Sequence, residues 1–317
     1  MTFKGFLSLV EIKTKVASII PFLLGTFYAI YRFDTFNFSN FIIMLVSLLS
    51  IDMATTAINN YYDYKKAHKK HGYGYEVHNG IVNYNMKESS VLFTIFVLII
   101  VAIIFGVLLF LNTNLIVLIL GAISFLVGIL YSFGPIPISR TPFGEIFSGV
   151  FMGFVIPFTS IYIHIYDVNI VNVILQNGLI DIKINMLEVI YIFLLSIPTI
   201  TSIGNIMLAN NICDIEEDIE NKRYTLPVYI GKEKSLRLFK MLYYLGFMSI
   251  VLLLILRVLP IIAILTIGTV MIVNKNIHLF YVKQTKKDTF IIAVKNFVVI
   301  NITLVFTLAI SLILRRL

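Results

Sequence analysis

Two segments of this chain place carboxylate and amide side chains three or four residues apart, which puts them on one face if the segment is helical. In the first segment these residues are Asp52, Thr56, Asn59 and Asp63. In the second they are Asn210 or Asn211, Asp214 and Asp218. Carboxylate and amide oxygens are the ligands that Mg²⁺ prefers, and Mg²⁺ commonly bridges protein carboxylates to substrate phosphates. Each face therefore indicates a site for a divalent cation and a phosphorylated substrate.

A simpler interpretation applies to the glutamates of the second segment. Glu216, Glu217 and Glu220 stand beside basic residues at the end of an apolar stretch, and an acidic run in that position is typical of a solvated loop. Asp52 and Asn59 differ because they lie in or near an apolar stretch. A charged side chain inside a membrane costs roughly 3 kcal/mol, so polar residues there usually face a cavity or a partner. We therefore interpret the Asn/Asp faces as functional and the glutamates as solvent-exposed.

The rest of the chain indicates what positions these segments. Of the 317 residues, 59% are hydrophobic and 13% are charged, which is too little charge to cover a soluble protein of this length. A membrane-spanning helix needs roughly 20 apolar residues. The stretches that approach this length are 16–33, 41–63, 90–111, 115–133, 144–166, 187–209, 236–256, 259–281 and 291–314. The predicted fold class is therefore all-α, with about nine transmembrane helices. Residues 167–186 are polar and amphipathic, and we expect an interfacial segment there.

The basic residues predict the orientation of the chain. If the N-terminus is inside, most of the 25 Lys and Arg residues fall on the inner side, as the positive-inside rule requires. This bias explains the net charge of +8, so no nucleic acid partner is expected. The charged connections 64–89 and 210–235 lie on the same side, and we expect them to cap a single transmembrane domain of residues 1–317. Both acidic segments then face the cytoplasm from the cell membrane.

The two acidic segments resemble the aspartate-rich motifs of the UbiA superfamily of intramembrane aromatic prenyltransferases. The second is the closer match, with Asp214 and Asp218 preceded by Asn210-Asn211 and followed by Lys222-Arg223-Tyr224-Thr225-Leu226. Three other stretches resemble the 1,4-dihydroxy-2-naphthoate polyprenyltransferase branch of menaquinone biosynthesis. They are Lys13 to Thr26, Asn79 to Val82 and Tyr131 to Glu145.

This resemblance implies a helical bundle around a central cavity. It also implies transfer of a prenyl group from a polyprenyl diphosphate to 1,4-dihydroxy-2-naphthoate, with Mg²⁺ as the cofactor. The implied metal ligands are Asp63, Asp214, Asp218 and Asn59. The implied substrate-binding residues are Asn59, Asn60, Asn211, Lys13, Lys222 and Arg223. Mg²⁺ neutralises the leaving diphosphate, and a dry chamber protects the allylic cation. An aromatic ring such as that of Tyr131 can stabilise this cation, so Tyr131 joins the three aspartates as an implied catalytic residue.

The first motif departs from the family pattern. Asn60 stands where the family has its first aspartate, and residues 67–70 supply no carboxylate for the last one. Glu11-Ile12 replaces the Arg-Pro pair that the family has before the first span. These departures imply weaker metal binding at the first motif, compensation by Glu76, or a changed substrate or activity.

Two other functions are compatible with the sequence. A related enzyme would use 4-hydroxybenzoate, a porphyrin-type acceptor or a glycerol phosphate, although the Tyr131–Glu145 stretch disfavours these acceptors. A secondary transporter would use Asp52 and the asparagines of the spans to line an ion path. Transporters, however, usually place such residues near the membrane midplane in broken helices. The acids of this chain gather instead at the inner ends of two spans, which favours a metal–phosphate site.

Overall fold

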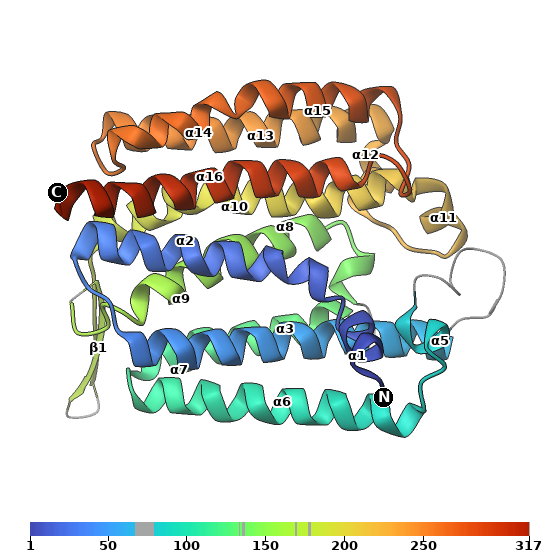
Figure 1. The fold of residues 1–317 in the computed structure, drawn as a ribbon, viewed down its shortest axis with the longest axis horizontal. Coiled ribbons are helices and arrows are strands. Elements are labelled where there is room, and N and C mark those ends of the chain that lie inside the picture. The colour runs from blue at the N-terminus through green and yellow to red at the C-terminus, as the bar shows by residue number, and fades with distance from the viewer. Residues whose placement is uncertain (67–78, 133, 135–136, 169, 177–178, 317) are drawn as a thin grey trace.

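The computed structural model describes residues 1–66, 79–132, 134, 137–168, 170–176 and 179–316, and shows a bundle of long helices with a β-hairpin at one end (Figure 1). The first half of the chain forms α1 (Phe3–Leu9), η1 (Ile12–Lys15), α2 (Val16–Phe33), α3 (Phe38–Lys66), α5 (Gly80–Asn83), α6 (Glu88–Leu111), α7 (Leu115–Ser132), η2 (Ile138–Arg140), α8 (Gly144–Val150), η3 (Phe151–Val155) and α9 (Ile156–Tyr162). The second half forms β1 (Val171–Gln176), β2 (Leu179–Ile184), α10 (Met186–Cys213), α11 (Ile215–Glu220), α12 (Leu226–Ile230), α13 (Lys232–Ile255), η4 (Ile261–Ala263), α14 (Ile264–Gly268), α15 (Val270–Val282) and α16 (Ile291–Arg316).

The apolar stretches predicted to span the membrane are helical. Within the residues that the structure describes, eight helices are long and apolar enough to cross a membrane, and Leu115–Tyr131 is a shorter apolar helix. The predicted all-α, multi-pass membrane fold is therefore confirmed, and the predicted count of about nine is approximate. The span predicted at 144–166 contains a π-helical turn, η3, between α8 and α9. Of the predicted cap over 64–89, residues 67–78 lie outside the described part of the chain.

The segment 167–186 is the exception to the helical pattern. Here β1 and β2 pair antiparallel, with Val171 opposite Ile184, and the hairpin lies at the end of the bundle opposite α11 (Figure 1). The expectation of an amphipathic interfacial segment did not specify this structure. Its sequence nevertheless carries the signal, because Ile180-Asp181-Ile182-Lys183-Ile184 alternates apolar and polar residues, which is the period of a β-strand.

Glycines let the helices in the middle of the bundle approach each other closely. A Cβ atom added at Gly153 of η3 would lie 2.5 Å from the backbone N and Cα of Ile200 in α10. A Cβ atom added at Gly25 of α2 would lie 2.5 Å from the carbonyl oxygen of Pro157 in α9. The Thr199 hydroxyl also donates to the Gly153 carbonyl oxygen at 2.7 Å. Small residues at such crossings are what permits close packing of helices in a membrane.

We expect Gly153→Ala to destabilise the protein by roughly 1–3 kcal/mol, the usual cost of overpacking. The added methyl group meets the backbone of α10, which cannot rotate away as a side chain can. Gly121→Ala in α7 is the matched control, because a Cβ atom there meets nothing within 4 Å. Thermal unfolding in detergent measures the difference. Equal unfolding temperatures for the two variants would show that the close approach contributes little.

Candidate active site at one end of the bundle

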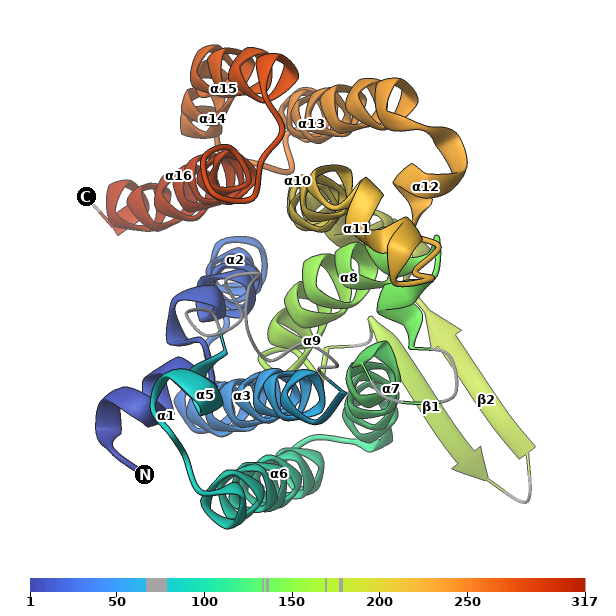
Figure 2. The same cartoon turned by 90° about the vertical axis from the view of Figure 1, so that its right-hand side faces the viewer.

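The two acidic segments lie at the same end of the bundle. The C-terminal end of α3, which carries Asn59 and Asp63, and the C-terminal end of α10, which leads into α11, both lie at this end (Figures 1 and 2). The N-terminal start of α8 and the connection between α15 and α16 lie there too. Side chains from four distant parts of the sequence can therefore contribute to one site.

Asp218 is the most buried of the predicted aspartates. Its side chain is 2% exposed, and one carboxylate oxygen, Oδ2, accepts a hydrogen bond from the Thr225 hydroxyl at 3.0 Å. The other oxygen, Oδ1, lies 3.4 Å from Nε of Arg223. Burial raises the pKa of Asp218 above its ordinary value, while Arg223 and Thr225 act in the opposite direction. A buried carboxylate of this kind gains stability from any further positive charge placed beside it.

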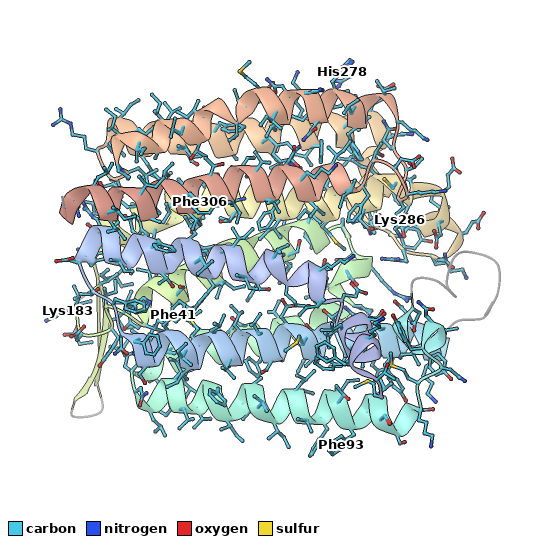
Figure 3. All side chains as sticks on the ribbon, viewed as in Figure 1. Phe41, Phe93, Lys183, His278, Lys286 and Phe306 are labelled. Atoms are coloured by element: carbon cyan, nitrogen blue, oxygen red, sulfur yellow. The ribbon has the colours of Figure 1, made fainter. Side chains whose placement is uncertain are left out.

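Asp214 is also buried, and it forms an ion pair with a lysine side chain. Its Oδ2 lies 2.5 Å from Nζ of Lys286, and the aspartate side chain is 6% exposed. Lys286 belongs to the connection between α15 and α16, and Figure 3 shows it at the same end of the molecule as α11. Lys286 was not among the predicted site residues, because it is one of several lysines in a basic connection far from both acidic segments.

A third buried carboxylate, Glu145, joins the site from the start of α8. Asn211 donates through Nδ2 to Oε1 of Glu145 at 2.8 Å. Oε2 of Glu145, Oδ1 of Asn211 and the Tyr131 hydroxyl are all buried and make no hydrogen bond within the described parts of the chain. Buried polar atoms normally have a partner, so these oxygens fit a polar or cationic ligand. Glu145 was not among the predicted site residues, although it stands at the start of a predicted span.

The face predicted from Asp52 to Asp63 is divided between two environments. Lys15, which is 2% exposed, donates from Nζ to Oδ1 of Asp52 at 2.6 Å and to the Thr56 hydroxyl at 2.7 Å. The Ser18 hydroxyl donates to the other oxygen of Asp52. Asp52 therefore forms an ion pair that joins η1 to α3, and Thr56 is hydrogen-bonded to the same lysine, so neither side chain faces a cation site shared with Asp63. The sequence interpretation missed this pair because it considered each helix separately.

Asn60 connects α3 to the N-terminal turn of the chain. Its Nδ2 donates to the carbonyl oxygen of Leu9 at 2.9 Å and to Oε1 of Glu11 at 3.2 Å. Asn79 donates from Nδ2 to the carbonyl oxygen of Asn60 at 2.8 Å. These contacts give Asn60 a structural role, and its predicted contact with substrate stays a prediction.

The remaining predicted residues are distributed around this end. Asn59 is half-buried and Asp63 is exposed on the last turns of α3, while Lys13 in η1 and Lys222 after α11 are exposed. Among the residues that the structure describes, no three Asp, Glu, His or Cys side chains gather closely enough to hold a metal ion. A cation at this site would therefore need amide or substrate oxygens in addition to carboxylates, which is how Mg²⁺ commonly binds beside phosphates.

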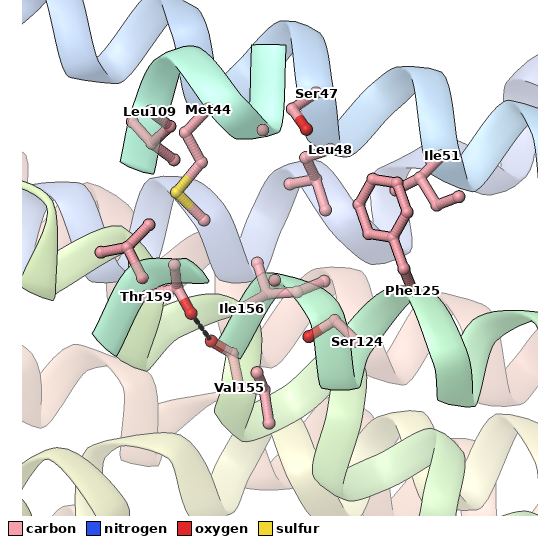
Figure 4. Close-up of a pocket in the computed structure, with 13 residues that line it drawn as sticks. Met44, Ser47, Leu48, Ile51, Leu109, Ser124, Phe125, Val155, Ile156 and Thr159 are labelled. Carbon is pink, nitrogen blue, oxygen red and sulfur yellow. Dashed lines mark hydrogen bonds between the residues drawn. The ribbon is translucent and has the colours of Figure 1, made fainter. Parts of the chain in front are cut away.

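An apolar cavity of about 100 Å³ lies between α3, α6, α7 and the α8–α9 segment (Figure 4). Most of its lining is aliphatic or aromatic, including Met44, Leu48 and Phe125. Its hydroxyl groups donate hydrogen bonds to backbone carbonyl oxygens. Thr159, for example, donates to the carbonyl oxygen of Val155 at 2.8 Å. Such a lining offers water few partners.

Comparison with known proteins identifies the arrangement. The sequence model of the UbiA prenyltransferase family matches residues 18–305. This chain belongs to the UbiA prenyltransferase family. The chain is also 33% identical over 241 residues to a 1,4-dihydroxy-2-naphthoate octaprenyltransferase of Bacillus subtilis (strain 168), a match that covers 75% of this chain and 70% of the relative. The protein is therefore a multi-pass membrane enzyme that transfers prenyl groups, and the transporter interpretation is set aside.

Solved structures of UbiA homologues share the fold. The Aeropyrum pernix K1 homologue gives a TM-score of 0.65 at 14% identity and covers 95% of this UbiA chain and 98% of its own. An Archaeoglobus fulgidus homologue bound to GPP and Mg²⁺ gives 0.62 at 14% identity, with 96% and 98% covered. At these identities the likeness shows the fold, while the substrates must be argued from the site.

Proposed function

We propose that this UbiA prenyltransferase transfers a polyprenyl group from a polyprenyl diphosphate to 1,4-dihydroxy-2-naphthoate, in menaquinone biosynthesis, with Mg²⁺ as its metal. The observation that carries the proposal is the pair of buried carboxylates, Asp214 and Asp218, each held against a basic side chain. Carboxylates bind the metal and basic groups bind phosphate oxygens. A site that places the two kinds of group side by side therefore suits a metal–diphosphate complex. The Bacillus subtilis relative is a 1,4-dihydroxy-2-naphthoate octaprenyltransferase, which supports the proposed acceptor. The Archaeoglobus fulgidus homologue is bound to GPP and Mg²⁺, which supports a prenyl diphosphate as donor and Mg²⁺ as the metal.

In this proposal Asp63, Asp214 and Asp218 would hold Mg²⁺, with Asn59 as a further ligand. Diphosphate oxygens would complete the coordination, because no three carboxylates among the described residues gather closely enough to hold a metal ion by themselves. When bound, the metal neutralises the negative charge that develops on the departing diphosphate. Arg223, Lys222 and Lys13 donate hydrogen bonds to the diphosphate oxygens, as basic groups commonly do.

The remaining groups act on the reacting carbon atoms and on water. The C1–O bond of the donor breaks, diphosphate takes the electron pair, and the aromatic carbon of the acceptor forms the new bond to C1 as its carboxylate is lost as CO₂. Tyr131 stands near the C-terminal end of α7, and its buried hydroxyl makes no hydrogen bond within the described residues. We assign its ring to the allylic cation. In this proposal the chamber around the allylic cation must exclude water, which would otherwise quench it.

We also propose that the N-terminus and the site face the cytoplasm from the cell membrane. The connections at this end carry most of the lysine and arginine residues, including Lys13, Lys222 and Lys286. Positive charge near the ends of spans is retained on the cytoplasmic side. Prenyl diphosphate is charged and water-soluble at its head, so a site that opens to the cytoplasm receives the head while the tail lies in lipid.

A reconstituted assay tests the proposed function. Purified protein is incubated with farnesyl diphosphate and Mg²⁺, and with 1,4-dihydroxy-2-naphthoate or 4-hydroxybenzoate in parallel reactions. We expect a prenylated, decarboxylated naphthoquinol product in the first reaction, no product after chelation by EDTA, and recovery when excess Mg²⁺ is added. Mass spectrometry of the extracted lipids identifies the product. A product formed only from 4-hydroxybenzoate would overturn the proposed acceptor. Full activity in EDTA would overturn the proposed requirement for Mg²⁺.

A further inference from the structure

The connection between α15 and α16, residues 283–290, brings a lysine into the site from a part of the chain that neither acidic segment includes. Nζ of Lys286 lies 2.5 Å from Oδ2 of Asp214. The lysine is 55% exposed and the aspartate 6% exposed, so the lysine side chain reaches inward from solvent to a buried carboxylate. Burial is the largest influence on the pKa of Asp218 and raises it, while Lys286 is one of the basic groups that act to lower it. One ammonium group therefore acts on both carboxylates of the second motif.

The backbone that carries Lys286 is held in place on both sides. Lys283 pairs with Asp288 at 2.6 Å, and the Thr285 backbone N–H donates to the Thr289 hydroxyl at 2.8 Å. The hydrogen bond from Lys283 lowers the pKa of Asp288, so Asp288 is an ionised carboxylate already engaged with another lysine. These contacts stabilise the backbone on both sides of Lys286, so a change in the partner of Lys286 can occur by rotation of its own side chain.

The position of the ammonium group has a consequence for ligand binding. A divalent cation bound by Asp214 would compete with Lys286 for the same carboxylate. A diphosphate bound to that cation brings several negative oxygens to the place from which the ammonium is displaced. Lysine binds phosphate as a point charge on a flexible stem. Its side chain can therefore rotate so that the ammonium group moves from the carboxylate to a phosphate oxygen.

We propose that Lys286 is a diphosphate-binding residue, which neutralises Asp214 until a metal–diphosphate complex enters and then transfers its ammonium group to a diphosphate oxygen. This inference rests on the proposed function, because it takes a prenyl diphosphate as the ligand. Its distinguishing feature is that Lys286 has opposite effects on two ligands. It weakens the binding of the bare divalent cation and strengthens the binding of the cation together with diphosphate.

Binding measurements on the full chain in detergent test this inference without turnover. The probes are Mn²⁺ alone, followed by electron paramagnetic resonance, and inorganic pyrophosphate with Mg²⁺, followed by calorimetry. Lys286→Met keeps the length of the side chain and removes its charge. We expect this variant to bind Mn²⁺ several-fold more tightly and Mg²⁺–pyrophosphate about tenfold more weakly, the scale of one charge-assisted hydrogen bond. Lys287→Met is the matched control, and both of its affinities should stay within about twofold of the wild type.

The outcomes separate this inference from the proposed function. If wild-type protein binds neither probe, the proposed metal–diphosphate site is wrong. If the wild type binds both and Lys286→Met matches it, the inference alone is overturned. A loss of both affinities in Lys286→Met would show that the lysine only supports the structure, and would also overturn it. Lys286→Arg retains the charge and should keep pyrophosphate binding within a few-fold of the wild type.

Discussion

Asp214→Asn and Asp218→Asn are each expected to lower prenyl transfer by roughly 100- to 1000-fold, the scale on which lost transition-state electrostatics reduces a rate. Asparagine has nearly the shape of aspartate, and at position 218 it can still accept the hydrogen bond that Thr225 donates at 3.0 Å. The change therefore removes charge while it preserves packing. Because both carboxylates are buried, their charge is poorly screened by water, and its loss should strongly weaken cation binding.

The control for this experiment lies in the same short helix. Glu217 is exposed on α11, and we expect Glu217→Gln to retain most of the activity. Initial rates of product formation from farnesyl diphosphate, measured at saturating Mg²⁺, compare the three variants. Turnover in Asp214→Asn close to that of Glu217→Gln would reject the assignment of Asp214 to the metal. Turnover in Asp218→Asn at that level would reject the assignment of Asp218.

Lys15→Met is expected to destabilise the folded protein by roughly 3–5 kcal/mol, the cost of leaving one member of a buried ion pair without the other. Lys15 is 2% exposed and Asp52 is 16% exposed, and methionine fills the space of the lysine without its charge. The Asp52 carboxylate would keep its bond from Ser18 and lose its only close cation within the described residues. Since Asp52 lies near the middle of α3 and most of its side chain is buried, water would solvate the unpaired charge poorly.

A second substitution distinguishes charge from packing in this experiment. Lys15→Met combined with Asp52→Asn removes both charges, and asparagine can still accept the hydrogen bond from Ser18. We expect the double variant to recover most of the lost stability in thermal unfolding measured in detergent. Lys13→Met, in the same 3₁₀ turn but exposed, should change the unfolding temperature little. If Lys15→Met unfolds at the temperature of Lys13→Met, the pair contributes no net stability.

The lengths and positions of the long helices follow directly from the apolar stretches of the chain. The predicted span 16–33 coincides with α2, and the predicted span 187–209 lies within α10. Both results have a local cause, because a run of about 20 apolar residues must form a helix to satisfy its backbone hydrogen bonds in lipid. The positions of Asp214 and Asp218 at the end of such a run also follow from the chain, as does their resemblance to a prenyltransferase motif.

The neighbour of each polar side chain depends on how the helices pack against one another. Asp52 and Asp214 are both aspartates at or near helical spans, yet one pairs with Lys15 of the short 3₁₀ helix η1 and the other with Lys286 from a distant connection. Glu145 meets Asn211 although they are 66 residues apart. The sequence pattern fixes which face of a helix a residue occupies, but not which other helix packs on that face. Since the strength of a charge pair depends on that neighbour and on the burial it provides, the roles of these residues could be assigned only after the helices were packed together.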